Sequence, residues 1–157
     1  MVIFLKREAF FYSMIENFKK SHIGPCSYDL TLGELFAYKK KTIDVNKNKL
    51  PEFSPLKLPY VLNPNELVMG RSVEIFHVPL DLMAIFKMRS TAFRLGLNIL
   101  IGVMDPGYNG EIVFGIHNIS KSSVVLHKGM SLVQGVFINM KGDAVPIQTK
   151  YMGGKLI

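Results

Sequence analysis

The chain has 157 residues, 48% of them hydrophobic, which is enough for one domain with a packed core and too little for two. Its 19 Lys and Arg residues outnumber its 12 Asp and Glu residues and give a formal charge of +7, which favours an anionic partner such as a nucleic acid or a nucleoside triphosphate. The single cysteine, Cys26, excludes an internal disulfide and a cysteine-rich zinc site, so we expect an intracellular, cytoplasmic protein.

The N-terminal segment, residues 1–25, predicts one amphipathic helix over Lys6 to Lys20. Apolar side chains recur there at spacings of three and four residues, as on a helix with one buried face. Charges at Lys6, Arg7 and Glu8 interrupt the apolar start of the chain, so the sequence predicts neither a signal peptide nor a membrane span. The apolar positions are Phe10, Phe11, Met14, Ile15 and Phe18.

Residues Ser27 to Tyr38 alternate with the period of a half-buried strand. Tyr28, Leu30 and Leu32 form one face, and Asp29, Thr31 and Gly33 form the other. Asp29 therefore lies on the less apolar face, where the plain interpretation is an exposed strand aspartate.

The segment from Lys39 to Leu62 is rich in Lys, Asn and Pro and predicts a weakly structured connection with short strands. Its lysines, at 39–41 and 47–49, are typical of a solvated loop, so we expect no nucleic-acid partner. Leu67 to Val78 and Leu82 to Met88 predict two further strands. Short strands at this spacing after a single helix favour an all-β barrel or jelly roll.

The stretch from Phe86 to Asn118 joins a basic corner to an acidic turn. Strands are predicted over Asn98 to Met104 and Glu111 to His117, on either side of the turn Asp-Pro-Gly-Tyr-Asn-Gly at 105–110. Pro106 restricts Asp105, while Gly107 and Gly110 permit a tight turn, so the carboxylate points in one direction. It suits a base that takes a proton from water. The alternative is a turn whose Asp bonds only its own backbone.

Arg89, Ser90 and Thr91 follow the strand that ends at Met88, where side-chain and backbone donors can converge on phosphate. A turn with a surface arginine is the competing interpretation. Arg94 lies five residues after Arg89, and on a helical turn the two would face different sides. For Tyr108, packing in the core competes with stacking on a sugar.

These stretches together resemble the dUTPase and dCTP deaminase superfamily. CSYDLTLGELF at 26–36, RSTAFRLGL at 89–97, GVMDPGYNGEIVFGIHN at 102–118 and HKGMSLVQGVF at 127–137 are similar to its first four motifs, in order along the chain. KYMGG at 150–154 is similar to the closing motif of the deaminase branch, although Met152 and Gly154 stand where that branch has glutamines. The resemblance covers nearly all of residues 1–157, so we expect a single dUTPase-like domain.

The resemblance implies a distorted jelly-roll β-barrel of the β-clip type, assembled as a homotrimer with active sites between subunits. It implies that Asp105 is the catalytic base, that Mg²⁺ accompanies a deoxyuridine or deoxycytidine triphosphate, and that Asp29 has a structural role or holds the metal through water. A mobile C-terminal tail, 149–157, would close over the phosphates. The implied substrate-binding residues are Arg89, Ser90, Thr91, Arg94, Asn98, Tyr108, Gln134, Lys150, Tyr151 and Lys155.

Within that family, Gly115 decides which reaction is expected. It aligns with the glutamate that moves protons to the pyrimidine amino group in the deaminase branch, and a glycine cannot transfer a proton. Glu111 lies four residues earlier, roughly 13 Å away along a strand. We therefore expect a dUTP diphosphatase, with dCTP deamination and a catalytically silent nucleotide sensor as alternatives. The segment between the arginine-serine corner and Asp105 is about two residues shorter than in the deaminases, which leaves base preference open.

The four histidines, at positions 22, 77, 117 and 127, share no metal-ligand spacing, so the sequence predicts structural or surface roles for them.

Overall fold

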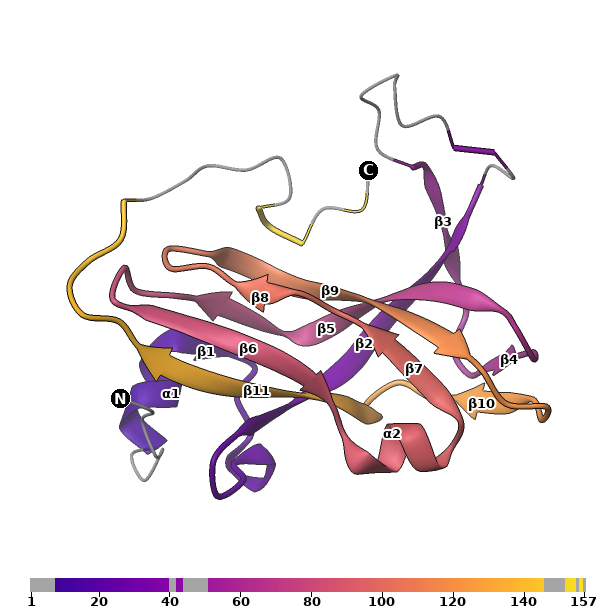
Figure 1. The fold of residues 1–157 in the computed structure, drawn as a ribbon, viewed down its shortest axis with the longest axis horizontal. Helices are drawn as coiled ribbons and strands as arrows, with labels where there is room; N and C mark the ends of the chain where they lie inside the picture. The colour runs from indigo at the N-terminus through magenta and orange to yellow at the C-terminus, as the bar shows by residue number, and fades with distance from the viewer. Residues whose placement is uncertain (1–7, 40–41, 44–50, 146–151, 155, 157) are drawn as a thin grey trace.

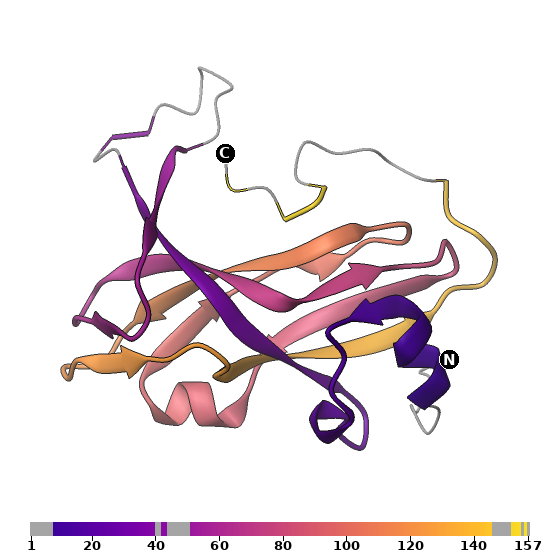
Figure 2. The same cartoon turned by 180° about the vertical axis from the view of Figure 1, so that it is seen from behind.

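The structure is a computed structural model that describes residues 8–39, 42–43, 51–145, 152–154 and 156. Within them, nine strands form one sheet in the order β7-β9-β5-β2-β11-β6-β8, with β1 paired to β5 and β3 paired to β2. The edge strand β7 contacts β6 near the other edge, so the sheet curls into a half-barrel (Figures 1 and 2). The strands of this sheet are β1 (Ile15–Glu16), β2 (Tyr28–Tyr38), β3 (Phe53–Leu56), β5 (Leu67–His77), β6 (Leu82–Met88), β7 (Leu97–Leu100), β8 (Val103–Met104), β9 (Asn109–Asn118) and β11 (Ser131–Asn139).

Smaller elements complete the fold. β4 (Tyr60–Leu62) and β10 (Val124–Leu126) pair with each other outside the main sheet. The helices are short: α1 (Glu8–Met14), the 3₁₀ helix η1 (Lys20–His22) and α2 (Ser90–Arg94), which links β6 to β7. None of the described helices is both long and apolar enough to cross a membrane. The expected all-β class with one N-terminal helix is confirmed.

The core follows from strand alternation. In β5, Val68, Gly70, Ser72, Glu74 and Phe76 are buried and their neighbours are partly exposed. Side chains of successive strand residues point to opposite faces, so the buried residues of β5 all lie on the face of the sheet that forms the core. Burial of these apolar faces is the main stabilising term.

Aromatic side chains attach α1 to the sheet. The ring of Phe11, fully buried, lies 5.3 Å from the ring of Tyr28 and 5.5 Å from that of Phe137. Edge-to-face and tilted contacts of this kind add to the free energy gained by burial.

Three local predictions were wrong. The helix expected over 6–20 ends at Met14, because Ile15 and Glu16 pair with β5 and Asn17 adopts a φ of 59°. The strand expected over 98–104 is divided into β7 and β8 at residues 101–102. The second face of β2 is not open, since Thr31 and Gly33 are buried as well. The predicted strands at 27–38, 67–78 and 82–88 are confirmed to within one residue at each end.

Candidate active site

The turn that carries Asp105 is held by main-chain hydrogen bonds. The N–H of Tyr108 donates to the carbonyl of Asp105 (3.2 Å), and the N–H of Gly107, whose φ is +77°, donates to the carbonyl of Pro79 (3.4 Å). The carbonyl of Tyr108 accepts from Val78 N–H (2.9 Å). The side chain of Asp105 is exposed. The backbone therefore fixes where this carboxylate lies, while water reaches it, as a general base requires.

Tyr108 packs inward from this turn. Its half-buried ring rests against the core, and its hydroxyl donates to the carbonyl of Glu111 and accepts from the N–H of Gly154. Burial raises the pKa of this hydroxyl, so it stays protonated at neutral pH. These contacts give Tyr108 a packing role. Stacking of its ring on a sugar stays a prediction.

The C-terminal tail contacts the same turn. The N–H of Gly153 donates to the carbonyl of Asn109 (2.9 Å), and Gly154 is buried against Glu111. A Cβ added at Gly110 would lie 2.3 Å from the Cα of Gly153, so the two glycines allow the two backbones to touch. Lys150, Tyr151 and Lys155 lie outside the described residues.

Arg89 forms the second part of the candidate site, at the start of α2. Its Nη2 lies 3.1 Å from Oδ2 of Asp29, its Nη1 donates to the carbonyl of Ser131 (3.4 Å), and its backbone N–H donates to the carbonyl of Leu132 (2.9 Å). The side chains of Arg89 and Asp29 are 34% and 19% exposed, so the ion pair is partly shielded from solvent. The structure thus brings together two of the predicted residues from distant motifs.

Gln134 lies beside this ion pair. In β11 it is directly opposite Asp29 of β2 on one side and Lys87 of β6 on the other, and β11 runs antiparallel to both of these strands. Side chains of directly opposed residues share a face about 5 Å apart. Sequence reasoning missed Lys87, although its place near the end of the strand that leads into Arg89 was a usable signal.

Burial raises the pKa of Asp29 above its usual value, and the nearby charges of Arg89 and His22 act in the opposite direction. The predicted role of Asp29 in holding a metal through water stays a prediction, with the Arg89 guanidinium already against its carboxylate. Within the described part of the chain, no group of three or more His, Cys, Asp and Glu residues is placed to hold a metal ion.

A polar chain, also missed from the sequence, continues from Asp29 into the core. The Nδ1–H of His22 donates to the Asp29 carbonyl (3.1 Å) and lies 3.7 Å from Oε1 of Glu74. Glu74 is fully buried, and its carboxylate accepts from the N–H of Thr31 (2.9 Å) and from its hydroxyl (2.7 Å). A buried carboxylate needs such partners, because burying a charge without them destabilises the folded state by about several kcal/mol.

The remaining predicted residues lie around α2. Ser90 and Thr91 are exposed in its first turn. Arg94 is also exposed, and its guanidinium lies 5.5 Å from the ring of Phe93. Asn98 faces outward on β7, opposite His117 of β9.

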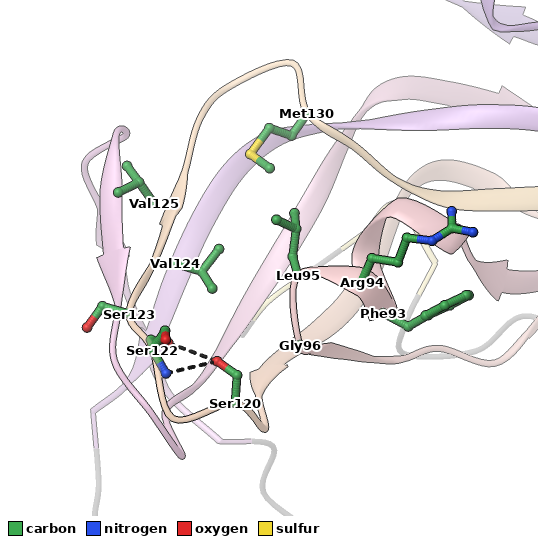
Figure 3. A pocket seen from close by; sticks show the side chains of 10 residues that line it. All are labelled: Phe93, Arg94, Leu95, Gly96, Ser120, Ser122, Ser123, Val124, Val125 and Met130. Carbon is green, nitrogen blue, oxygen red and sulfur yellow. Dashed lines mark hydrogen bonds between the residues drawn. The ribbon is translucent and has the colours of Figure 1, made fainter.

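A surface pocket of about 630 Å³ lies between α2 and the loops that flank β10 (Figure 3). Arg94 is the one predicted site residue in its lining, and neither Asp105 nor Arg89 contributes to it. Arg94 therefore borders this pocket while Arg89 does not, and the groups that the two arginines bind stay predictions. The lining consists of Phe93, Arg94, Leu95, Gly96, Ser120, Ser122, Ser123, Val124, Val125 and Met130.

The two parts of the candidate site are not adjacent within one chain. Met104 of β8 pairs with Ala84 of β6, which places Asp105 beside the start of β6, whereas Arg89 follows its end (Figure 1). The six residues between the start of β6 and Arg89 correspond to about 20 Å along a strand. The chain therefore presents a carboxylate at one end of β6 and a basic corner at the other.

Gly115 is buried in β9, where it lies opposite Leu100 of β7 on one side and Met69 of β5 on the other. A Cβ added there would lie 3.1 Å from the Cβ of Leu100, its direct partner on β7. Leu100 thus occupies the space into which a longer residue at 115 would extend.

The curled β sheet that carries the Asp-Pro-Gly turn and the arginine-serine corner has the fold of the dUTPases and dCTP deaminases. The chain belongs to the dCTP deaminase-like family, whose model matches residues 10–140. Its relatives include a dUMP-forming dCTP deaminase of Dictyoglomus turgidum, 33% identical, with 87% of this chain and 76% of that protein covered. A dCTP deaminase of Pyrococcus furiosus is 31% identical, with 89% and 85% covered.

Solved structures share the fold at lower identity. A 2′-deoxycytidine 5′-triphosphate deaminase from Agrobacterium tumefaciens has a TM-score of 0.66 at 20% identity and covers 82% of this chain, which spans 45% of that one. A mutant dUTPase from phage phi11 of S. aureus, in which a structural Mg(II) ion is coordinated, has a TM-score of 0.55 at 16% identity, with 84% and 88% covered. The chain spans 66% of the length of a dCTP deaminase from Halorubrum lacusprofundi, which is 31% identical.

Proposed function

We propose that this chain, as a single dUTPase-like domain, is a dUTP diphosphatase that converts dUTP and water to dUMP and pyrophosphate. Asp105 takes a proton from a water molecule while the oxygen of that water bonds to the α-phosphorus. The bond from the α-phosphorus to the oxygen that bridges it to the β-phosphorus then breaks and releases pyrophosphate. The exposed carboxylate of Asp105, fixed by the backbone around it, is the observation that carries the proposal.

The corner around Arg89 binds the phosphates. Arg89 carries more N–H donors than its contacts with Asp29 and Ser131 use, so donors remain for phosphate oxygens. Gln134 and Lys87 face the same side of the sheet and add a neutral and a charged donor. Further contacts come from Ser90, Thr91 and Arg94, and from Lys150, Tyr151 and Lys155 of the tail, while Asn98 and Tyr108 contact the nucleoside.

A second copy of the chain completes the site. Asp105 and Arg89 lie about 20 Å apart along β6, farther than one α-phosphate can span. A homotrimer with sites between subunits brings the Asp105 turn of one copy to the Arg89 corner of another. The exposed apolar pair Ile85 and Val103 on the outer face of the sheet supports such an assembly.

Mg²⁺ would be held mainly by the phosphates of the nucleotide. The described residues include no cluster of metal ligands, and Mg²⁺ is commonly held by one or two carboxylates, water and substrate phosphates. The ion would offset the negative charge of the triphosphate.

dCTP deamination is the second candidate, and the names of the relatives favour it. Forming dUMP from dCTP, as in the Dictyoglomus turgidum relative, requires both loss of the amino group and release of pyrophosphate. Gly115 argues against the first step in this chain, because it offers no group to move a proton and Leu100 fills the adjoining space.

Product analysis separates these reactions. The purified protein is incubated with dUTP, dCTP, dTTP and dATP, each with Mg²⁺, and products are identified by chromatography and an ammonia assay. We expect dUMP and pyrophosphate from dUTP and no ammonia from dCTP. Ammonia from dCTP would support the deaminase, and no product from any nucleotide would support a silent nucleotide-binding protein.

A further inference from the structure

The polar chain from Glu74 to Arg89 joins the core to the phosphate-binding corner. Arg89 is held by Asp29 through a 3.1 Å contact, and Asp29 is held in turn by His22 through its main-chain carbonyl. His22 approaches the fully buried Glu74, which Thr31 fixes with two hydrogen bonds. Each residue in the chain is thus oriented by one that is more deeply buried.

We propose that Asp29 and His22 are positioning residues, which hold the Arg89 guanidinium in the orientation that receives the triphosphate. This inference rests on the proposed function, since it takes Arg89 as a phosphate ligand. It assigns Asp29 to the arginine and not to a metal ion, and it gives His22, which lies outside every motif, a part in substrate binding.

The geometry supports positioning over simple charge balance. An arginine side chain loses much rotational freedom when it binds, and an anchor that fixes it beforehand lowers that cost. Asp29 and Ser131 contact Arg89 from the neighbouring strands β2 and β11, so the guanidinium is held from two sides. His22 uses Nδ1 for its contact, which makes the proposal specific to one ring nitrogen.

Nucleotide binding is measured by calorimetry with the nonhydrolysable α,β-imido analogue of dUTP, first in EDTA and then over a series of Mg²⁺ concentrations. We expect Arg89→Ala and Asp29→Ala each to raise Kd in EDTA at least about tenfold, and the double variant to bind no more weakly than either single variant. The Mg²⁺ concentration that gives half of the full gain in affinity should not change in Asp29→Ala.

The histidine is tested by replacing one ring nitrogen at a time. His22→Phe should raise Kd about threefold, His22→Asn should restore it because the amide nitrogen replaces Nδ1, and His22→Gln should not. His77→Phe is the matched control, since His77 also pairs with a carboxylate, that of Glu16 (2.6 Å), away from Arg89. Thermal unfolding of each variant identifies any that fails to fold. If His22→Phe does not fold, comparing His22→Asn with His22→Gln still tests the role of Nδ1.

Three results would overturn the proposal. If Arg89→Ala weakens binding and Asp29→Ala does not, Arg89 needs no positioning. If Asp29→Ala raises the Mg²⁺ requirement but leaves binding in EDTA unchanged, Asp29 serves the metal. If Arg89→Ala itself binds normally, the corner is not a phosphate site and the proposed function fails with it.

Discussion

Asp105 owes its position to the backbone on either side of it, since no side chain among the described residues pairs with its carboxylate. The hydrogen bonds at Gly107 and Tyr108 hold the turn, while the side chain remains exposed. A substitution that keeps the size of this side chain should therefore remove its basicity without disturbing the fold.

Asp105→Asn should lower kcat for dUTP by about 10²-fold or more, because the amide cannot accept the proton from water. The free energy of unfolding should change by less than about 0.5 kcal/mol, as for most exposed positions. Pyrophosphate release and denaturant unfolding measure the two effects. Asp81→Asn, at an exposed aspartate of the adjoining turn, is the control and should keep full activity. Wild-type turnover in Asp105→Asn would exclude this base.

Gly115 lets β7 and β9 approach closely, since Leu100 lies where its side chain would be. Gly115→Glu should destabilise the protein by about 1–3 kcal/mol through overpacking. Adding Leu100→Ala should recover part of this loss, and urea unfolding of both single variants and the double variant gives the coupling. Additive effects would mean that the two side chains do not compete. An ammonia assay on the double variant shows whether the glutamate brings deamination.

Strand β9 contributes side chains to the core and main-chain contacts to the C-terminal tail. Its even-numbered positions from 110 to 118 are buried, while its first residues carry the main-chain contacts to Gly153 and Gly154. Gly153 and Gly154 thus lie against the first residues of β9, directly after the Asp105 turn. The contact depends on backbone approach, so a single Cβ should break it.

Gly154→Ala should release the tail. The added Cβ would lie 2.7 Å from the Glu111 carbonyl oxygen, and the φ of +64° is unfavourable for alanine. We expect faster hydrogen exchange at residues 152–154 and a KM for dUTP raised several-fold, about 3- to 10-fold if the tail contributes about 1 kcal/mol of binding. Gly142→Ala is the matched control, because its φ is +91° and open space surrounds it. Equal effects in both variants would rule out a specific tail contact.

The whole molecule leaves apolar side chains on the outer face of its sheet. Ile85 and Val103, paired between β6 and β8, are 36% and 58% exposed. Ile85→Asp should dissociate the assembled protein into folded monomers that lack turnover, because each active site needs two copies. Size-exclusion chromatography with light scattering measures this. Val145→Asp, at a residue that is 84% exposed outside the strands, should leave the assembly intact. A monomeric wild-type protein with full activity would contradict the shared site.

Mixing two inactive variants tests the shared site directly. Asp105→Asn and Arg89→Ala are unfolded together and refolded at equal concentration, so that subunits combine at random. A site that takes Asp105 from one copy and Arg89 from another would be intact in about one case in four, and up to a quarter of wild-type turnover should return. Each variant refolded alone is the control. No recovery would place both residues in the same copy.

The sequence by itself determined the class of fold and most of the strands. Alternation in β5 and β6 predicts these strands because each has one buried face, and the Pro-Gly pattern at 105–110 predicts the turn because few other residues adopt its backbone angles. The order of the motifs along the chain, from Cys26 to Gly154, pointed to the family that the comparison found. Such features are local, so neighbouring residues suffice to specify them.

Only the tertiary structure decided which of these residues meet. The ion pair of Arg89 with Asp29 joins positions 60 residues apart, and the contact of Glu74 with Thr31 joins positions 43 apart. Strand pairing sets these contacts, and a pattern of period two does not encode which strands become neighbours. For the same reason the separation of Asp105 from Arg89 along β6 was hidden in the sequence, where the two lie only 16 residues apart.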